Sequence, residues 1–374
     1  MKDSRATREI LSDKRTLSAI LAGGVRPDID LDPHDPGDPA SDSDSFYVLS
    51  YLEGDGHKFT VLFHLIVLNK PRPPGPASLL DISVLDETVN PPIFFSREVP
   101  DIGLSSTSVA NGKLNIQVFS TPNRQTVLGH LSGTPDKLLV EGRVLGNSGS
   151  AQIEIAIVLS AVGPTLPDLA SGVIPFPGGL NYEYAFPRMK TVGTLKIEGV
   201  TYDVSGSSWL DREWGHYGSL KWTWMGIQLN NDVLISLWDQ QDYQENPQTY
   251  VGGKAFATIL DASDNITTTT VSIKENTFAA SQDGTRMYPD SWTVTIPGKG
   301  TLEVKTLTGG QDIVSMIPRL EAKSKASGTY EGKRVDGTAF VEAGLIPPPP
   351  SAGVTPPNPT VNPQPPTANA PTRV

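Results

Sequence analysis

The turn Gly54-Asp55-Gly56 stands between two mostly apolar runs of the chain, residues 46–52 and 58–65. An Asp-Gly turn between two such runs is the strongest short-range signal for a β-hairpin. Further short runs recur at regular spacing, without the helical patterns of about 10–15 residues that parallel α/β folds require between strands. The chain is therefore predicted to be all-β, as a meander or barrel. The additional predicted strands cover residues 113–120, 125–132, 137–144, 151–159, 193–197, 201–205, 223–229, 233–239, 253–260, 291–296, 301–306 and 328–335.

Length and composition divide the chain into four parts. Its 374 residues exceed the usual size of one hydrophobic core, so two domains are predicted, over residues 46–205 and 206–346. A Pro/Gly-rich joint at residues 162–180 precedes the second series of strands. Residues 1–45 form a preface that is partly irregular. Residues 347–374 hold eleven of the 33 prolines and almost no large apolar side chains, so this tail is predicted to be disordered.

Charge and hydropathy exclude several kinds of partner. The formal net charge of −11 would repel nucleic acid and anionic membrane surfaces, whose phosphates need clustered Lys and Arg. No run of about 18 apolar residues exists, so membrane insertion is not expected. The chain is predicted to be cytoplasmic, or secreted if it is a trimmed mature form. Neither charge nor length indicates an oligomeric state.

Several kinds of chemistry lack their motifs. The chain has no cysteine, no glycine-rich nucleotide loop and no His-Glu-x-x-His segment. Its five histidines are scattered, with no pair at ligand spacing, so neither a metal nor another cofactor is predicted. His64 lies in an apolar run and is interpreted as a core residue with its hydrogen bonds satisfied.

Five of the six tryptophans fall within thirty residues, together with a dense group of charged side chains. Strand alternation puts Asp211 and Glu213 on one face with Trp209, and Arg212 and Trp214 on the other. Asp211 and Arg212 are predicted to be structural anchors that pair with groups on opposite sides of the strand. Trp214 is predicted to line a pocket, since indole rings supply large apolar walls.

Three residues are candidates for proton transfer. Asp239 ends an apolar strand, where loss of solvent would raise its pKa and allow it to donate a proton. Glu213 and His216 belong to, or directly follow, the charged run that contains Trp214. The alternatives are a strand-end turn for Asp239 and a surface loop for His216.

The same residues resemble the lipocalin-like superfamily of carotenoid hydratases, kievitone hydratases and cofactor-free Diels-Alderases. The resemblance is most specific over residues 180–240. The segments that carry it are residues 184–195, 204–206, the Trp-Leu-Asp-Arg-Glu-Trp-Gly run 209–215, and residues 222–224, 237–239, 328–332 and 339–342.

The resemblance implies two lipocalin-like barrels or sandwiches with a pocket in or between them. The position of Arg212 resembles that of a histidine that serves hydration in carotenoid hydratases. Because a guanidinium cannot exchange its proton at neutral pH, Arg212 cannot take over that role. Trp214 and Asp239 match the family positions. The form Asp-Arg-x-Trp-Gly is closer to the kievitone hydratase and Diels-Alderase branches.

The predicted function is a cofactor-independent cyclase of the Diels-Alder kind, acting on a hydrophobic unsaturated small molecule. Orienting a flexible substrate and hydrogen-bonding its carbonyl would suffice for such a reaction. The alternatives are an alkene hydratase or dehydratase of the kievitone hydratase type, which needs a proton donor, and a non-catalytic carrier. The predicted substrate contacts are Trp214, Trp222, Trp224, Tyr184, Gln228 and Trp238.

Overall fold

The computed structural model describes residues 42–68, 78–90, 92–101, 106–110, 113–119, 126–145, 151–245, 248–251, 253–315 and 317–346. Their regular structure is antiparallel strand, apart from the short 3-10 helix η1 (Asp168–Ala170). The prediction of an all-β fold is confirmed. The predicted disordered tail and most of the predicted preface lie outside the described residues.

The first sheet contains thirteen strands, in the order β4-β3-β2-β1-β13-β12-β9-β8-β7-β6-β5, with β10 and β11 also paired to β12. The central strands β12 and β13 are the longest of the sheet and pair with each other along most of their length. The strands are β1 (Ser43–Gly54), β2 (His57–Leu68), β3 (Ser78–Asp86), β4 (Ile93–Asp101), β5 (Ser106–Ala110), β6 (Lys113–Phe119), β7 (Val127–Thr134), β8 (Lys137–Leu145), β9 (Ala151–Ala161), β10 (Leu166–Pro167), β11 (Val173–Phe176), β12 (Gly179–Ile197) and β13 (Val200–Gly215).

The second sheet contains eleven strands, in the order β18-β17-β15-β14-β24-β23-β21-β20-β19, with β16 paired to β15 and β22 to β23. The last strand of the chain, β24, therefore lies beside the first strand of this sheet, β14. The strands are β14 (Leu220–Leu229), β15 (Leu234–Glu245), β16 (Gln248–Val251), β17 (Phe256–Leu260), β18 (Ile266–Thr270), β19 (Ser272–Ala280), β20 (Met287–Ile296), β21 (Gly300–Thr306), β22 (Asp312–Ile313), β23 (Arg319–Tyr330) and β24 (Lys333–Ile346).

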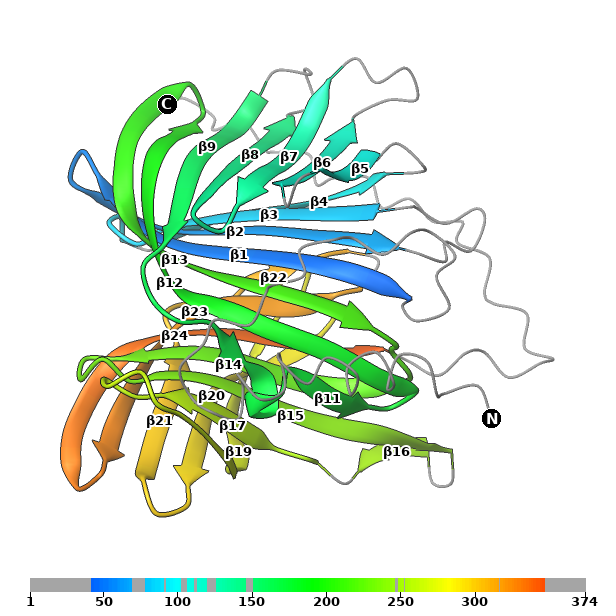
Figure 1. The fold of residues 1–374 in the computed structure, drawn as a ribbon, viewed down its shortest axis with the longest axis vertical. Coiled ribbons are helices and arrows are strands. Elements are labelled where there is room, and N and C mark those ends of the chain that lie inside the picture. Colours follow the sequence, from blue (N-terminus) through cyan, green and yellow to red (C-terminus); the bar gives the residue numbers. More distant parts are fainter. Residues whose placement is uncertain are drawn as a thin grey trace, which may run out of the picture.

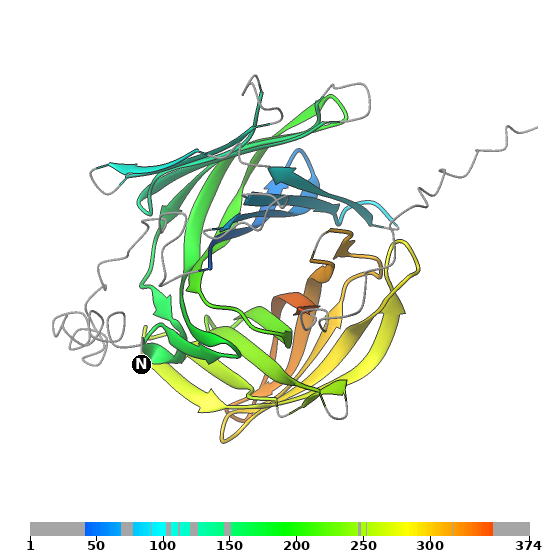
Figure 2. The same cartoon turned by 90° about the vertical axis from the view of Figure 1, so that its right-hand side faces the viewer.

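The two sheets curl and pack against each other, as Figures 1 and 2 show. Each sheet encloses an apolar core of its own, one that includes Phe63 and Ile157, the other Ile235 and Trp292. A third apolar cluster, which includes Trp209 and contains residues of both sheets, lies between them. Strands β1, β12 and β13 of the first sheet lie next to β14, β23 and β24 of the second (Figure 1).

The hairpin predicted at residues 46–65 is confirmed as β1 and β2. Asp55 and Gly56 both have positive φ, 50° and 82°, as the two central residues of a type I′ turn require. The alternation of residues 209–214 is also confirmed, because Leu210 faces the first core while Trp209 faces the inter-sheet cluster.

The predicted strand at residues 328–335 is wrong. Strand β23 ends at Tyr330 and β24 begins at Lys333, with a tight turn between them. Glu331 and Gly332 in that turn have φ of 50° and 74°, the same turn chemistry as at Asp55. The strand predicted from residue 253 begins only at Phe256.

The predicted joint at residues 162–180 carries β10, η1 and β11, all attached to the first sheet. The predicted border between residues 205 and 206 falls inside β13. The division into two domains stays a prediction. Among the described residues, no helix is long or apolar enough to cross a membrane.

Candidate active site

The candidate site lies where the two sheets face each other, in a setting walled by aromatic rings. The rings of Trp209 from β13 and Trp224 from β14 meet edge to face at 6.1 Å between centroids. Tyr47 from β1 contacts Trp224 in the same manner at 5.4 Å. The buried aromatic residues of this inter-sheet cluster are Tyr47, Phe176, Trp209, Trp222, Trp224, Trp238, Phe256 and Phe340.

Three carboxyls of the first sheet point into this aromatic interface. Glu183 on β12 and Glu213 on β13 are directly opposed in the antiparallel pairing, and Asp211 lies two residues before Glu213 on the same face. Like charges directly opposite each other on neighbouring strands are destabilising. At least part of this group must therefore be protonated in the folded protein.

A fourth carboxyl, Asp168, comes from the helix η1 and is 1% exposed. Its Oδ2 accepts a hydrogen bond from Ser236 Oγ of the second sheet at 3.2 Å. The backbone N–H of Leu169 donates to Thr258 Oγ1 of β17 at 2.9 Å. The strands on either side of η1, β10 and β11, pair with the first sheet, whereas η1 itself forms hydrogen bonds to the second sheet.

The backbone of η1 is strained. Leu169 and Ala170 have φ of 51° and 57°, in the left-handed region that costs a non-glycine residue roughly 1–2 kcal/mol. Strain of this kind persists only where the surroundings enforce it, and it concentrates at functional sites. Here it places Asp168 between the sheets.

Burial separates the pKa values of these acids. Loss of solvent, with the charge of Glu342 next in size, raises the pKa of Glu213 to about 8. Loss of solvent also raises the pKa of Asp168, to about 6, against the opposing effect of its hydrogen bonds. The pKa values of Asp211 and Glu183 are raised well above their usual range, again chiefly by burial. At neutral pH Glu213 is therefore mostly neutral, while Asp168 is mostly ionised.

Glu213 is the carboxyl of this group nearest to solvent. The residue is partly buried, whereas Asp168, Glu183 and Asp211 are at most 5% exposed. Its Oε1 accepts a hydrogen bond from Asn181 Nδ2. Glu213 is thus the least enclosed of the four carboxyls.

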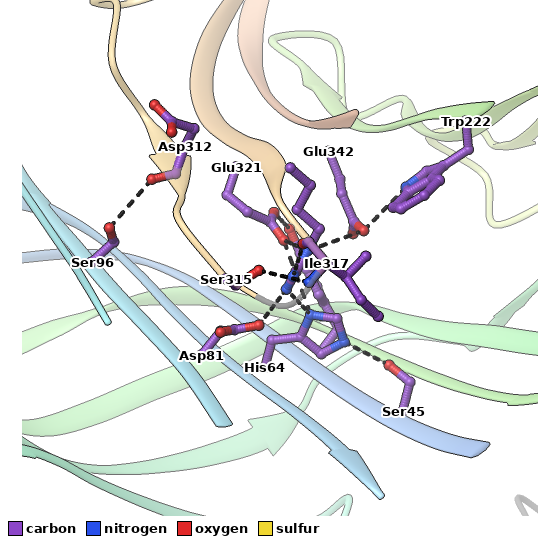
Figure 3. A network of polar contacts seen from close by, with 12 residues as sticks. Ser45, His64, Asp81, Ser96, Trp222, Asp312, Ser315, Ile317, Glu321 and Glu342 are labelled. Atoms are coloured by element: carbon purple, nitrogen blue, oxygen red, sulfur yellow. Dashed lines mark hydrogen bonds and ion pairs between the residues drawn. The ribbon is translucent and has the colours of Figure 1, made fainter. Parts of the chain in front are cut away.

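A second polar group, centred on Arg319 of β23, lies in the same interface and involves β2 and β3 of the first sheet. Its guanidinium donates to Asp81 Oδ2 at 2.5 Å and to Glu321 Oε1 at 2.8 Å. It also lies 3.0 Å from His64 Nδ1, and the other ring nitrogen of His64 is 2.8 Å from Ser45 Oγ. Figure 3 shows these side chains converging from both sheets. His64 is thus a buried residue with partners at both ring nitrogens.

Glu342 of β24 connects the two polar groups. Its Oε1 accepts a hydrogen bond from Trp222 Nε1 at 3.1 Å and lies 3.5 Å from Arg319 Nε (Figure 3). Glu342 also pairs directly across from Glu321 on β23. Burial raises the pKa of Glu342 although Arg319 opposes the shift.

One group among the described residues has the spacing of a metal-ligand set. Ligand atoms of His64, Glu321 and Glu342 all lie within 4.8 Å of one another. The Arg319 guanidinium lies within 3.5 Å of all three side chains and already supplies their positive charge. The geometry therefore fits an internal ion-pair network better than it fits a metal ion.

The structure brings some of the sequence-predicted residues together and separates others. Glu213 and Asp211 share the interface with Trp222, Trp224 and Trp238. Asp211 Oδ1 accepts a hydrogen bond from Trp209 Nε1 at 2.5 Å.

Trp214 and Tyr184 lie on the opposite face of β12 and β13, against the core of the first sheet. Their rings meet edge to face at 5.7 Å. Arg212 forms a fully buried ion pair with Asp44 there, and its Cζ lies 4.6 Å from the Phe46 ring centroid and 4.7 Å from that of Trp214. Trp214 and Arg212 are therefore separated from Glu213 by the sheet itself.

Asp239 is not part of the acid group. Alternation on β15 turns Trp238 toward the interface and Asp239, like Leu237, toward the other face. Its Oδ2 accepts a hydrogen bond from Gln241 Nε2 at 3.3 Å, and its pKa is raised mainly by burial.

His216 and Gln228 lie at the margins of the interface. His216 follows β13 and places its Nδ1 3.1 Å from Asp42 Oδ2. Gln228 is partly buried on β14, six residues beyond Trp222, and pairs across from Thr338.

Sequence reasoning did not identify Asp168, Glu183, Glu342 and Arg319. Glu183 and Glu342 each stand alone among apolar neighbours in a strand, a pattern that marks a buried charge. Asp168 gave no signal, because its segment reads as an irregular joint. The convergence of these residues depends on strands far apart in the chain.

The described residues also include a hollow of about 430 Å³ that lies away from the acids. It is lined by residues of β7, β8, β9, β12 and β13, with Glu141, Arg143 and Glu154 among them. Arg143 and Glu154 form an ion pair at 3.1 Å with considerable exposure. The perturbed carboxyls between the sheets mark a functional site better than this polar hollow does.

Comparison with known proteins places the chain among relatives of similar architecture. The model of the family described as AttH-like matches residues 150–343. Kievitone hydratase from Fusarium solani subsp. phaseoli is 24% identical over 320 residues, which are 81% of this chain and 83% of that protein. Dehydratase asqC from Emericella nidulans is 28% identical over 185 residues, 46% of this chain and 52% of that protein.

Two solved structures share the fold. Kievitone hydratase from Nectria haematococca superposes with a TM-score of 0.63 at 22% identity, over 84% of this chain and 91% of that one. CghA superposes with a TM-score of 0.58 at 10% identity, over 82% of this chain and 88% of that one. The fold of this chain is therefore shared with proteins that have little sequence in common with it.

Proposed function

The chain belongs to the AttH-like family, and on that premise we propose that it adds water to, or removes water from, a carbon–carbon double bond of a hydrophobic small molecule. The substrate would bind between the two sheets, beside Glu213. The observation that carries the proposal is the burial of Glu213, which lies opposite Glu183 on the neighbouring strand, in an aromatic setting. Loss of solvent, with the charge of Glu342 next in size, keeps this carboxylic acid mostly neutral at neutral pH.

The protonation states of Glu213 and Asp168 at neutral pH suit them to act as an acid and a base. Neutral Glu213, with its pKa of about 8, would donate a proton to an alkene carbon during hydration, or to a departing hydroxyl during dehydration. Ionised Asp168, with its pKa of about 6, would accept a proton from the attacking water or from the substrate carbon. Environments that push the pKa values of two carboxyls apart are the usual basis for such a division of roles.

The aromatic walls suit the charge that such a reaction develops. Protonation of an alkene leaves positive charge on carbon, and indole faces attract cations by roughly 0.5–2 kcal/mol each. Trp222, Trp224 and Trp238 contribute indole rings to the interface. Fixed groups of this kind stabilise a transition state without reorganising.

The relatives support the same reaction class. Their names describe a hydratase and a dehydratase, the two directions of one reaction. The matched region of the family model, residues 150–343, includes Asp168, Glu183, Asp211, Glu213 and Glu342.

Cyclisation of an unsaturated substrate is the second candidate. The same aromatic walls would hold a polyene in a folded shape, and a neutral Glu213 would hydrogen-bond a substrate carbonyl. Such a reaction exchanges no oxygen with water, which separates the two candidates.

The test measures product formation in ¹⁸O-labelled water, with kievitone as the first substrate and a panel of unsaturated hydrophobic alcohols after it. Hydration should place one labelled oxygen in the product. Glu213→Gln should lower the rate by about 100-fold or more, since a positioned proton donor contributes about 10²–10⁴-fold. Asp239→Asn is the matched control, an acid of raised pKa on the other face, and should keep the wild-type rate.

Each other outcome revises the proposal. A cyclised product without label would favour the second candidate. If Asp239→Asn lowered the rate as much as Glu213→Gln, the site would not be confined to the interface between the sheets, because Asp239 lies on the other face of β15. With folded protein, a panel in which no substrate takes up label and none loses water would contradict the proposal.

A further inference from the structure

The interface contains a buried amine at the end away from Glu213. Lys323 of β23 is 9% exposed and lies on the same face as Arg319 and Glu321. Its Nζ lies 3.7 Å from the centroid of the Tyr51 ring, and Tyr51 is six residues along β1 from Ser45, which pairs with Glu213. Six residues of strand span roughly 20 Å, so this amine forms a separate polar group.

The surroundings of Lys323 only partly compensate for its burial. Glu87 Oε1 lies 3.8 Å from Nζ, beyond hydrogen-bond distance, and accepts a hydrogen bond from Thr60 Oγ1 at 2.6 Å. Lys58 and Lys325 add positive charge nearby. A lysine that is both desolvated and close to other cations is the arrangement that activates amines as nucleophiles.

The charge state agrees with this geometry. Burial, opposed by Glu87, lowers the pKa of Lys323 to about 8. Tyr51 has a raised pKa, chiefly from burial, and therefore keeps its hydroxyl proton. A sizeable neutral fraction of the amine thus stands beside a phenol that can donate a hydrogen bond and a carboxylate that can accept a proton.

We propose that Lys323 is a second reactive centre of this protein, an amine that condenses reversibly with the aldehyde or ketone carbonyl of a small hydrophobic molecule. The proposal rests on Lys323, Tyr51 and Glu87, and it is independent of the reaction assigned to Glu213. A simple ion pair that joins the two sheets is the competing role.

The condensation balances without an added reactant. The nitrogen lone pair of Lys323 attacks the carbonyl carbon, the carbonyl oxygen gains the proton of the Tyr51 hydroxyl, and the nitrogen loses one proton to Glu87. The resulting carbinolamine loses its hydroxyl, which leaves as water with the proton returned by Glu87, and the nitrogen gives its remaining proton back to the Tyr51 oxygen. A carbon–nitrogen double bond replaces the carbon–oxygen double bond, and hydrolysis reverses every step.

The test is reductive trapping with benzaldehyde and sodium cyanoborohydride on the full-length protein, read by peptide mass spectrometry. The hydride reduces any imine to a stable benzylated amine. At pH 8 Lys323 should be labelled on the order of tenfold faster than Lys325, which is exposed on the same strand, because a lowered pKa enlarges the neutral amine fraction. The rate at Lys323 should be half-maximal near pH 8.

Two variants provide controls. Lys323→Arg keeps the charge and should remove the fast label, while Lys325→Arg should leave it unchanged. Labelling of Lys323 at or below the rate of Lys325 would overturn the proposal and leave the ion pair as its role. The comparison of these two lysines within the wild-type chain decides the matter even where Lys323→Arg does not fold.

Discussion

At the scale of single residues, the two carboxyls Asp168 and Glu213 determine the pH dependence of the proposed reaction. A base must be ionised and an acid must be protonated, so activity should rise as Asp168 ionises near pH 6 and fall as Glu213 ionises near pH 8. Because the two carboxyls interact, the apparent pKa values of the rising and falling parts of the pH profile are properties of the pair and not of either residue alone. Measured rates between pH 4 and 10 should follow a bell with its maximum near neutrality.

The variant Asp168→Asn tests the assignment of the base. The amide can still accept the hydrogen bond from Ser236 but cannot accept a proton, so the rate should drop and the acidic limb should disappear from the residual activity. An acidic limb that persists in folded Asp168→Asn protein would show that another group is the base.

At the scale of elements, η1 shows how the first sheet supplies a side chain to the second. Glycine tolerates positive φ without the steric cost that alanine bears, so Ala170→Gly should stabilise the protein by about 1 kcal/mol. Urea denaturation would measure the change. The matched control is Ala279→Gly in β19, where extended backbone makes glycine unfavourable by about 0.5–1 kcal/mol. A destabilised Ala170→Gly protein would mean that the strain of η1 is relieved by other contacts.

At the scale of the whole molecule, the buried acids oppose the packing of the two sheets as the pH rises. The raised pKa of Glu213 means that its stabilising contribution is complete below its ordinary value of 4.5 and is lost as the pH rises toward about 8. Within that window the ionisation of Glu213 lowers the free energy of unfolding by roughly 1.4 kcal/mol per pH unit. The melting temperature should therefore fall between pH 5 and pH 8.

The variant Glu213→Gln isolates the contribution of that one group. It removes an ionisation, so its melting temperature should depend less on pH than that of the wild type and should exceed it at pH 8. A wild-type melting temperature that is constant or rises over this range would contradict the buried, neutral state of Glu213.

The sequence by itself determined the all-β class, many of the strands, the turn at Asp55-Gly56 and the two faces of residues 209–214, but it did not predict β3, β4, β18 and β19. These features depend on neighbours in the chain, since alternation and turn conformation are local properties. The same local reading missed the turn at Glu331 and left Asp239, Glu213 and His216 as three candidates for proton transfer. In a single strand, no pattern distinguishes the face that meets another sheet from the face that covers a core.

Only the tertiary structure decided which acids meet. Asp168, Glu183, Glu213 and Glu342 come from four segments, and their pKa values follow from burial between two sheets and from one another's charge. Both effects act through space, at distances that the order of residues does not specify. The sequence therefore placed Glu213 on one face with Trp209 and Asp211, and the packing of the second sheet against that face buried it and raised its pKa.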